Sequence, residues 1–191
     1  MSCIKFIQYI LLCVKYLPIL VIFYVNENEQ LTKDMIHYSK YFGFRRNNYF
    51  TLAYLFEKIP EFRNIFFFRY NKVSFLRKVY KGVNNLYFFT SAKNIGGGLL
   101  FWHGFSTAIN AISIGENCEI WQNVTIGKKS TDKIPDKPTI GDNVRICANS
   151  VVIGPIKIGN NVIIGAGTVV TKDIPDDSIV VGNPARILNN K

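Results

Sequence analysis

Histidine is scarce in this chain of 191 residues, where only His37 and His103 are present. Two imidazoles cannot supply a zinc site built of three histidines within one chain. The four cysteines lack the paired spacing of metal ligands, and a chain of this length does not need a disulfide framework. We therefore expect no metal ion, and we expect reduced, buried thiols in a cytoplasmic protein.

Acidic residues and glycines are scarce in the N-terminal half. Residues 1–93 hold 14 Lys and Arg against five Asp and Glu, and they carry 23 of the 27 aromatic residues but two of the 14 glycines. Amphipathic patterns over 31–47, 49–59 and 61–81 predict helices, the last starting at Pro60 and ending at Gly82. A basic, aromatic helical module favours an anionic membrane surface over nucleic acid.

No apolar run of bilayer length is free of polar residues. Residues 4–25 are long enough to span, but two lysines and a glutamine interrupt them and Pro18 predicts a kink. No small-residue cleavage site follows, so we do not expect a secretory signal. The pattern favours an interfacial or oligomer-packing helix, with a transmembrane span and a buried helix as alternatives, so residues 1–26 are a candidate contact with the inner face of the cytoplasmic membrane.

An aliphatic residue recurs at every sixth position in the second half. These residues are Ile114, Ile120, Ile126, Ile140, Ile146, Val152, Ile158, Ile164 and Val170. The fourth residue after each is small or β-branched: Cys118, Val124, Ser130, Val144, Ser150, Ile156, Val162, Thr168 and Ile174. A period of six fits neither a helix nor a hairpin but fits a parallel β-helix, in which stacked coils bury one core. We expect an α+β chain with a helical module over 1–88 and the β-helix over 89–191.

Glycine often follows the repeated aliphatic residue, and we interpret it as a response to the backbone angles of tight corners. The spacing from Ile126 to Ile140 is 14 residues, eight more than one hexad. The extra residues predict an extruded loop over 128–138, which is polar and holds two prolines. Such a loop can reach a neighbouring subunit or a ligand; a tolerated surface insertion is the alternative.

His103 is the better candidate for a catalytic base. It lies in GGGLLFWHGFSTAIN, at the start of the solenoid, among glycines and small polar residues. Imidazole exchanges a proton near neutral pH, although a packed ring beside Phe101 and Trp102 is the alternative. A coil of three hexads, about 18 residues, would place Trp121 one coil above His103 and shield its imidazole.

The hexads, the extruded loop and the ending VVGNPARIL resemble the left-handed β-helix acyltransferases of hexapeptide repeats, particularly the serine acetyltransferase-like branch, over about residues 90–188. The resemblance implies a homotrimer of left-handed prisms and acetyl-CoA in a groove between subunits. It implies that His103 deprotonates an acceptor hydroxyl for attack on the thioester. Residues that match cofactor-binding positions, or are candidates for the nucleotide phosphates, are Thr125, Gly127, Ala148, Ala166, Lys172 and Arg186. For Lys172 and Arg186, the alternative is that they are solvated charges at corners of the solenoid without a ligand.

The departures from serine acetyltransferases concern the acceptor. Those enzymes carry an Asp directly before the histidine, where this chain has Trp102, and a second Asp about fifteen residues earlier, near Phe88. Their Arg-His pair in the loop corresponds to Asp136 and Lys137. These losses argue against free serine, and Trp102 and Trp121 offer stacking surfaces for a sugar, with Lys137 available for an acidic group. We therefore predict an acetyl-CoA-dependent O-acetyltransferase acting on a sugar hydroxyl of a bacterial surface polysaccharide or its precursor.

Three alternatives stay open. The first is a serine O-acetyltransferase of cysteine biosynthesis with a rearranged site. The second is an N-acetyltransferase of an amino sugar nucleotide, whose amide product would resist mild alkali. The third is a non-enzymatic trimeric scaffold, which predicts no acetyl-CoA binding and no effect of changing His103.

Overall fold

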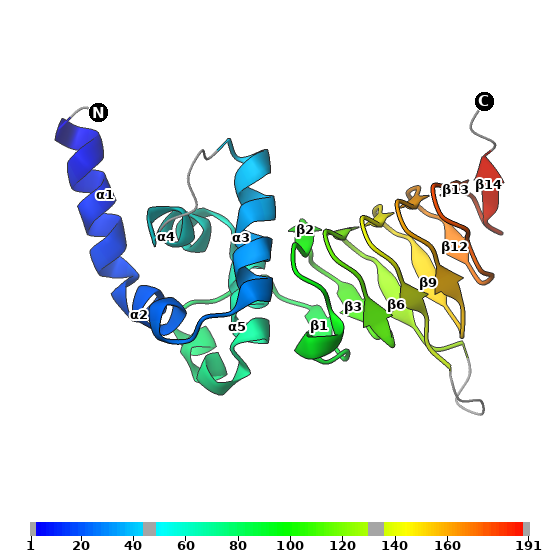
Figure 1. The fold of residues 1–191 in the computed structure, drawn as a ribbon, viewed down its shortest axis with the longest axis horizontal. Coiled ribbons are helices and arrows are strands. Elements are labelled where there is room, and N and C mark those ends of the chain that lie inside the picture. The colour runs from blue at the N-terminus through cyan, green and yellow to red at the C-terminus, as the bar shows by residue number, and fades with distance from the viewer. Residues whose placement is uncertain (1–2, 44–48, 130–135, 189–191) are drawn as a thin grey trace.

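The computed structural model describes residues 3–43, 49–129 and 136–188, with side chains from residue 7 onward. Its helices precede its strands, as the composition predicts (Figure 1). The helices are α1 (Cys3–Lys15), α2 (Leu17–Val25), α3 (Glu29–Tyr41), α4 (Tyr49–Lys58), α5 (Pro60–Arg69) and the 3-10 helix η1 (Asn71–Lys78). The third predicted helix is therefore broken, because Tyr70 leaves helical geometry at φ −108° and ψ 65°.

The apolar N-terminal run forms two helices. Pro18 lies in the first turn of α2, where its missing N–H removes no helical hydrogen bond. Among the described residues, no single helix is long and apolar enough to cross a membrane; Ile7–Lys15 and Leu17–Val25 pass that test only as a pair bent by 69°. An exposed apolar row follows the pair: Ile7, Ile10, Leu11, Val14, Leu17, Val21, Tyr24 and Val25. Association of this row with a membrane surface stays a prediction.

The C-terminal part is a prism of three sheets (Figure 1). One sheet contains β1 (Leu86–Phe88), β3 (Thr107–Ile109), β6 (Thr125–Gly127), β9 (Val151–Ile153) and β12 (Val169–Val170). The second contains β4 (Ser113–Ile114), β7 (Thr139–Ile140) and β10 (Lys157–Ile158). The third contains β2 (Leu100–Trp102), β5 (Glu119–Trp121), β8 (Arg145–Ile146), β11 (Ile163–Ile164), β13 (Ile179–Val181) and β14 (Arg186–Leu188). A short 3-10 turn, η2 (Ala92–Asn94), precedes β2. The named strands pair in parallel except β13 with β14.

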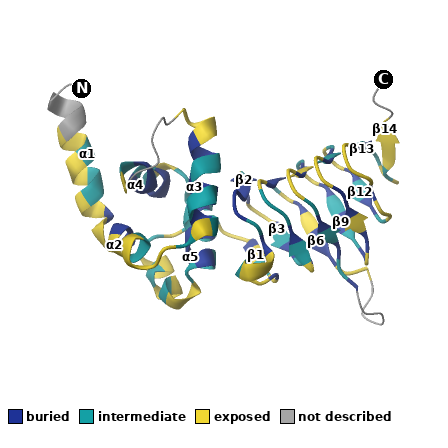
Figure 2. Ribbon diagram, in the orientation of Figure 1, coloured by how far each residue is buried: buried dark blue, intermediate teal, exposed yellow. Residues whose placement is uncertain are grey.

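The repeated aliphatic residues fill the prism, which confirms the parallel β-helix. All nine are at most 3% exposed (Figure 2). The second inward positions are also buried where the structure describes them; Ser130 lies outside the described residues. The predicted boundary after residue 88 stays a prediction, although Leu86–Phe88 already pairs with β3 of the solenoid.

Our reason for the glycines that follow the repeated aliphatic residues was wrong, because none of the five adopts positive φ. Gly115, Gly141 and Gly159 do not adopt positive φ; a Cβ on each would lie 2.5–2.8 Å from backbone atoms of the next coil. Glycine is needed there because the coils approach closely. The left-handed corner conformation is instead adopted by residues such as Asn117 and Asn143, both at φ 56°. Asparagine tolerates this conformation better than most side chains do.

Candidate active site

One corner of the prism gathers several predicted site residues. Trp102 of β2 is in register with Trp121 of β5, so the two residues begin a column of stacked positions. The registers of β5 with β8 and of β8 with β11 extend this column along the prism. The next residue on each coil is here assigned to a corner row: His103, Gln122, Ala148 and Ala166. Its last three members stack in register, whereas the first coil has two extra residues at this corner, where Asn123 N–H donates to Phe105 O. Hydrogen bonds from Asn149 N–H to Gln122 O and from Gly167 N–H to Ala148 O join its coils. Since coils stack about 4.8 Å apart, Ala148 lies about 5 Å and Ala166 about 10 Å along the edge from Gln122.

His103 begins the corner row. It is exposed and adopts φ 51°, a left-handed conformation that is uncommon outside glycine and that clusters at functional sites. Its carbonyl oxygen accepts a hydrogen bond from Phe105 N–H at 2.6 Å. Within the described parts of the chain the imidazole itself has no hydrogen-bond partner, so both ring nitrogens are free to meet a substrate.

A pocket of about 370 Å³ lies beside this imidazole. It lies between α3, the α4–α5 junction and β2, and its walls include Phe42, Phe101 and Trp102. Lys58 and Glu61 add one cation and one carboxylate to its lining. The pocket therefore combines an aromatic wall with charges of both signs next to a candidate base.

Trp102 and Trp121 stack on each other, with ring centroids 6.0 Å apart. Trp121 therefore lies above Trp102 and not above His103 as predicted, because this coil is 19 residues long. Tyr41 packs against the Trp102 ring edge to face at 4.9 Å, and Trp102 Nε1 donates to Glu119 Oε2 at 3.0 Å. The two indoles already pack against each other, which reduces the surface that either offers to a ligand.

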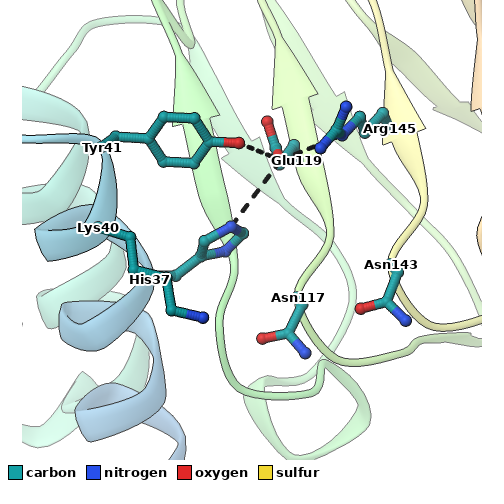
Figure 3. Close-up of a pocket in the computed structure, with 7 residues that line it drawn as sticks. All are labelled: His37, Lys40, Tyr41, Asn117, Glu119, Asn143 and Arg145. Atoms are coloured by element: carbon teal, nitrogen blue, oxygen red, sulfur yellow. Dashed lines mark hydrogen bonds and ion pairs between the residues drawn. The ribbon is translucent and has the colours of Figure 1, made fainter.

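Glu119 is a functional candidate that the sequence did not reveal (Figure 3). Its side chain is only 5% exposed, and Oε1 accepts from Tyr41 Oη at 2.6 Å. Arg145 Nε lies 3.3 Å and His37 Nε2 lies 3.8 Å from the same oxygen. Burial, followed by the hydrogen bond to Glu119, raises the pKa of Tyr41. The hexad pattern predicts that Glu119 faces outward from the prism. In the structure α3 covers it, and the contacting Tyr41 lies 78 residues before it in the chain.

A second pocket, of about 320 Å³, surrounds this carboxylate (Figure 3). Lys40, Asn117 and Asn143 complete its lining. Among the described residues, no group of three or more His, Cys, Asp or Glu is arranged to hold a metal ion.

Gln122 also escaped the sequence-based prediction. Its Oε1 is buried and, in the described structure, accepts no hydrogen bond. Leaving such an oxygen unpaired costs about 1–3 kcal/mol. A polar residue in an otherwise small-residue column was its only sequence signal.

Arg186 lies near the opposite end of the corner row from His103. In β14 it pairs with Val181, and its Nε is 3.6 Å from the position that a Cβ on Gly182 would occupy. Gly182 follows β13, one coil beyond Ala166. The edge therefore has an imidazole near one end and a guanidinium near the other.

The remaining predicted residues lie away from this edge. Thr125 and Gly127 belong to β6, in another sheet, and Lys172 is exposed after β12. Lys137 is half-buried before β7, next to Asp136. The Lys128 ammonium, 2.6 Å from Asp136 Oδ2, lowers the pKa of that carboxyl. Residues 130–135 of the predicted extruded loop lie outside the described residues, so its contacts stay predictions, as do all the predicted site assignments.

Comparisons with known proteins agree with the predicted fold and with the predicted resemblance to serine acetyltransferases. The model of the bacterial transferase hexapeptide family (six repeats) matches residues 137–172. Serine acetyltransferase of Synechococcus elongatus is 41% identical over 95 residues, which is 49% of this chain and 39% of that protein. Serine acetyltransferase of Bacillus pumilus is 37% identical over 123 residues, which is 61% of this chain and 56% of that protein. The chain thus spans about half the length of the curated relatives it matches.

Solved structures extend the similarity across the helical part. A serine acetyltransferase of Neisseria gonorrhoeae in complex with serine matches with TM-score 0.62 and 25% identity, covering 84% of this chain and 68% of that chain. The soybean serine acetyltransferase complexed with serine has the same TM-score at 24% identity, covering 87% of this chain and 72% of that chain. The latter likeness shows the fold alone.

These matches correct one prediction. A polysaccharide acceptor was predicted, and that prediction was wrong, because the relatives and solved structures to which this chain is similar are consistently named serine acetyltransferases. The absence of carboxylates at Phe88 and Trp102 was therefore not sufficient to exclude serine. These matches confirm the predicted resemblance of the solenoid to the left-handed β-helix acyltransferases of hexapeptide repeats, particularly to their serine acetyltransferase-like branch.

Proposed function

We propose that the protein is an acetyl-CoA-dependent serine O-acetyltransferase with His103 as general base. The observation that carries this proposal is one edge of the third sheet, where His103 follows β2 and Ala148 and Ala166 follow β8 and β11, with Arg186 near the far end. Small side chains leave the backbone of this edge accessible to an extended pantetheine arm, and a guanidinium suits the phosphates at the nucleotide end. Lys172 is a second candidate for those phosphates.

The chemistry is a direct transfer. A neutral His103 imidazole accepts the proton of the serine hydroxyl while the oxygen attacks the thioester carbonyl. The tetrahedral oxyanion then collapses to the acetyl ester and breaks the carbon–sulfur bond. The departing CoA thiolate takes the proton from the imidazolium, which restores the base. A hydrogen-bond donor near the oxyanion lowers the barrier, and the left-handed turn after His103 offers backbone N–H groups for this purpose.

The pocket beside His103 supports an amino acid as acceptor. Its lining includes the carboxylate of Glu61 and the ammonium of Lys58, which complement the ammonium and carboxylate of free serine. These groups come from the α4–α5 junction of the helical module, not from the positions before the histidine. We therefore propose that this chain binds serine with charges supplied by its helices.

A thiol-release assay tests the proposal. Purified protein is incubated with acetyl-CoA and L-serine, D-serine, L-threonine or no acceptor, and the product is identified by mass spectrometry. We expect CoA release and O-acetylserine with L-serine, and a fall in kcat of at least about 100-fold in His103→Asn, the range of general-base catalysis. The exposed variant Lys93→Gln is the matched surface control. Full activity of His103→Asn, or no L-serine turnover by the wild type, contradicts the proposal.

We also propose that the protein assembles as a homotrimer. The similarity of the solenoid to the bacterial transferase hexapeptide family, whose prisms form trimers, supports this assembly. Light scattering coupled to size-exclusion chromatography should give three times the chain mass of 21.8 kDa. A monomeric mass across the concentration range of the activity assay contradicts it.

The exposed apolar row of α1 and α2 supports peripheral membrane binding. Residues 1–26 carry no acidic side chain, which favours an anionic lipid surface. We expect flotation with vesicles that contain anionic phospholipid, and loss of flotation in Leu11→Glu/Val14→Glu. Phe75→Glu, which changes a 67% exposed ring on η1, is the control. Self-association of the protein without vesicle binding contradicts the membrane proposal.

A further inference from the structure

The β2 strand that leads to His103 lies at the end of its sheet. It pairs with β5 on one side, and no described strand pairs with its other side. An uncovered edge leaves backbone N–H and C=O groups without partners. Helix α3 covers this edge with side chains, so the helix occupies the place that a preceding coil would take in the rest of the solenoid.

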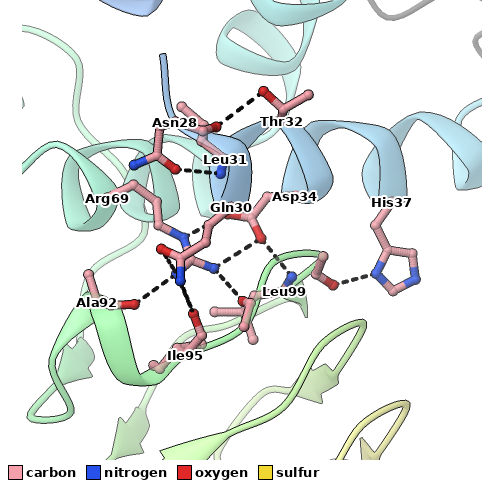
Figure 4. A network of polar contacts seen from close by, with 12 residues as sticks. Asn28, Gln30, Leu31, Thr32, Asp34, His37, Arg69, Ala92, Ile95 and Leu99 are labelled. Carbon is pink, nitrogen blue, oxygen red and sulfur yellow. Dashed lines mark hydrogen bonds and ion pairs between the residues drawn. The ribbon is translucent and has the colours of Figure 1, made fainter. Parts of the chain in front are cut away.

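The covering side chains form one stripe on α3, here called the α3 stripe: Gln30, Asp34, His37, Tyr38 and Tyr41. Spacings of three and four residues place them on one helix face. Figure 4 shows how the first three of them reach the segment before β2. Asn28 caps the helix by accepting from Leu31 N–H at 2.8 Å, which fixes where the stripe begins.

The α3 stripe binds the backbone of residues 95–101 group by group. Gln30 Nε2 donates to Ile95 O at 3.1 Å, and His37 Nδ1 donates to Gly98 O at 2.5 Å. Asp34 Oδ1 accepts from Leu99 N–H at 2.7 Å. Tyr38 Oη accepts from Phe101 N–H at 2.9 Å, and Trp102 packs against Tyr41.

Arg69 of α5 completes the network from the other side. Its guanidinium donates to Ile95 O at 2.7 Å and to Gly96 O at 2.6 Å. Nε lies 2.9 Å from Asp34 Oδ2, and both side chains are 0% exposed. Burial raises the pKa of Asp34, and the Arg69 guanidinium opposes this rise. The segment is therefore held by buried, charge-assisted hydrogen bonds, which are stronger than those between neutral groups.

We infer that the α3 stripe positions His103 for catalysis and that, of its side chains that hydrogen-bond the backbone before His103, Tyr38 is the nearest to it. The inference rests on the proposed acetyl transfer. Tyr38 fixes Phe101, two residues before His103, from a site that is 1% exposed. Because His103 itself has no described hydrogen-bond partner, its place depends on the backbone that carries it. The helical module would then act directly on the reaction rate through β2.

Tyr38→Phe removes one hydroxyl and keeps the ring that packs against Phe62. Tyr70→Phe is the matched control, since the Tyr70 hydroxyl binds Asn26 O and does not touch the 95–103 segment. With acetyl-CoA and L-serine we expect kcat to fall about 10- to 100-fold in Tyr38→Phe, the range for a small misplacement of a catalytic group. Because Tyr38 also lines the pocket beside His103, KM is measured for both substrates. KM for acetyl-CoA and for L-serine should change by less than about twofold, because a shift confined to the base leaves uniform binding unchanged. A purely structural hydrogen bond would lower Tm and leave kcat at 25 °C unchanged.

A second readout separates this inference from the proposed function. The chain has only two histidines, so the imidazole Hε1 signals of His103 and His37 are readily assigned by NMR with His103→Gln. We expect the His103 signal to shift or broaden in Tyr38→Phe and to stay unchanged in Tyr70→Phe. Turnover absent from the wild type would refute the proposed function, and the NMR comparison would still decide the inference. Unchanged kcat in Tyr38→Phe, or an unchanged His103 signal, overturns it.

Discussion

Replacing Arg69 with methionine tests how much of the stability depends on the junction between helices and solenoid. Methionine retains part of the arginine stem but removes the partner of Asp34, whose carboxylate is 0% exposed. It also removes the donor to the carbonyls of Ala92, Ile95 and Gly96, at 3.1, 2.7 and 2.6 Å. The variant therefore leaves the buried Asp34 carboxylate without its cation and the Gly96 carbonyl without its donor, whereas Ile95 O keeps Gln30 Nε2 and Ala92 O keeps Ile95 N–H.

The magnitude follows from these losses. Breaking a buried ion pair from one side costs about 3–5 kcal/mol, and each buried carbonyl that loses its donor costs about 1 kcal/mol or more. We expect the free energy of unfolding to fall by at least about 4 kcal/mol, out of about 5–15 kcal/mol for a typical domain. At about 2–4 °C per kcal/mol for a chain of this size, Tm should fall by at least about 8–16 °C.

Thermal melts and urea titrations followed by circular dichroism measure this loss. Lys15→Met is the control, because the Lys15–Glu57 pair at 2.6 Å has its lysine side chain 58% exposed and should contribute at most about 1 kcal/mol. In Asp34→Leu/Arg69→Met both charges are gone, so we expect part of the stability to return while the Gly96 carbonyl still lacks the Arg69 donor. If Arg69→Met melts within a degree or two of Lys15→Met, the reasoning about this junction is refuted.

Three other predictions use single positions of the solenoid. Gly141→Ala should destabilise the fold by about 1–3 kcal/mol, because its Cβ would lie 2.8 Å from Gly159 backbone atoms. Gly127→Ala is the control: its Cβ would meet no atom within 4 Å, so Tm should change by about a degree at most. Equal melting temperatures of the two variants would contradict the argument from close approach. Burial raises the pKa of Cys118 to about 12, so its contribution to the free energy of unfolding is complete below about pH 9 and falls by up to about 4 kcal/mol as pH rises toward 12. Urea unfolding across this pH range should show a smaller loss of stability in Cys118→Ala than in the wild type. An identical loss would refute this prediction. Gln122→Leu removes the buried, unpaired Oε1, so it should raise Tm in thermal melts. An unchanged or lower Tm would contradict the cost assigned to that oxygen.

The predicted helices and the β-helix core agree with the structure for different reasons. The period of six is a local property, and each coil contacts only its neighbours, so Ile120 and Ile146 could be placed in one column without knowledge of the rest of the chain. Helix ends were less accurate: the predicted 61–81 helix breaks at Tyr70. Pattern recognition cannot detect such a break because the apolar spacing continues through it.

The candidate site was predicted only in part. The sequence singled out His103, Ala148 and Ala166, but it did not place them on one edge, since a coil of 19 residues shifts the register by one from the ideal repeat of three hexads. It missed Gln122 for the same reason. The acceptor was misjudged because the loss of two expected carboxylates was visible in the sequence, whereas the charges that α4 and α5 bring to the pocket were not.

The sequence by itself therefore determined the solenoid core, the helical character and basic charge of the first half, and His103 as the candidate base. Only the tertiary structure decided what surrounds that base: the α3 stripe along β2, the buried Asp34–Arg69 pair and the covered carboxylate of Glu119. The physical reason is how far apart in the chain the contacting residues lie. Core burial in a solenoid repeats from each coil to the next, but the contacts between α3 and β2 join residues more than 60 positions apart and exist only once the helices dock.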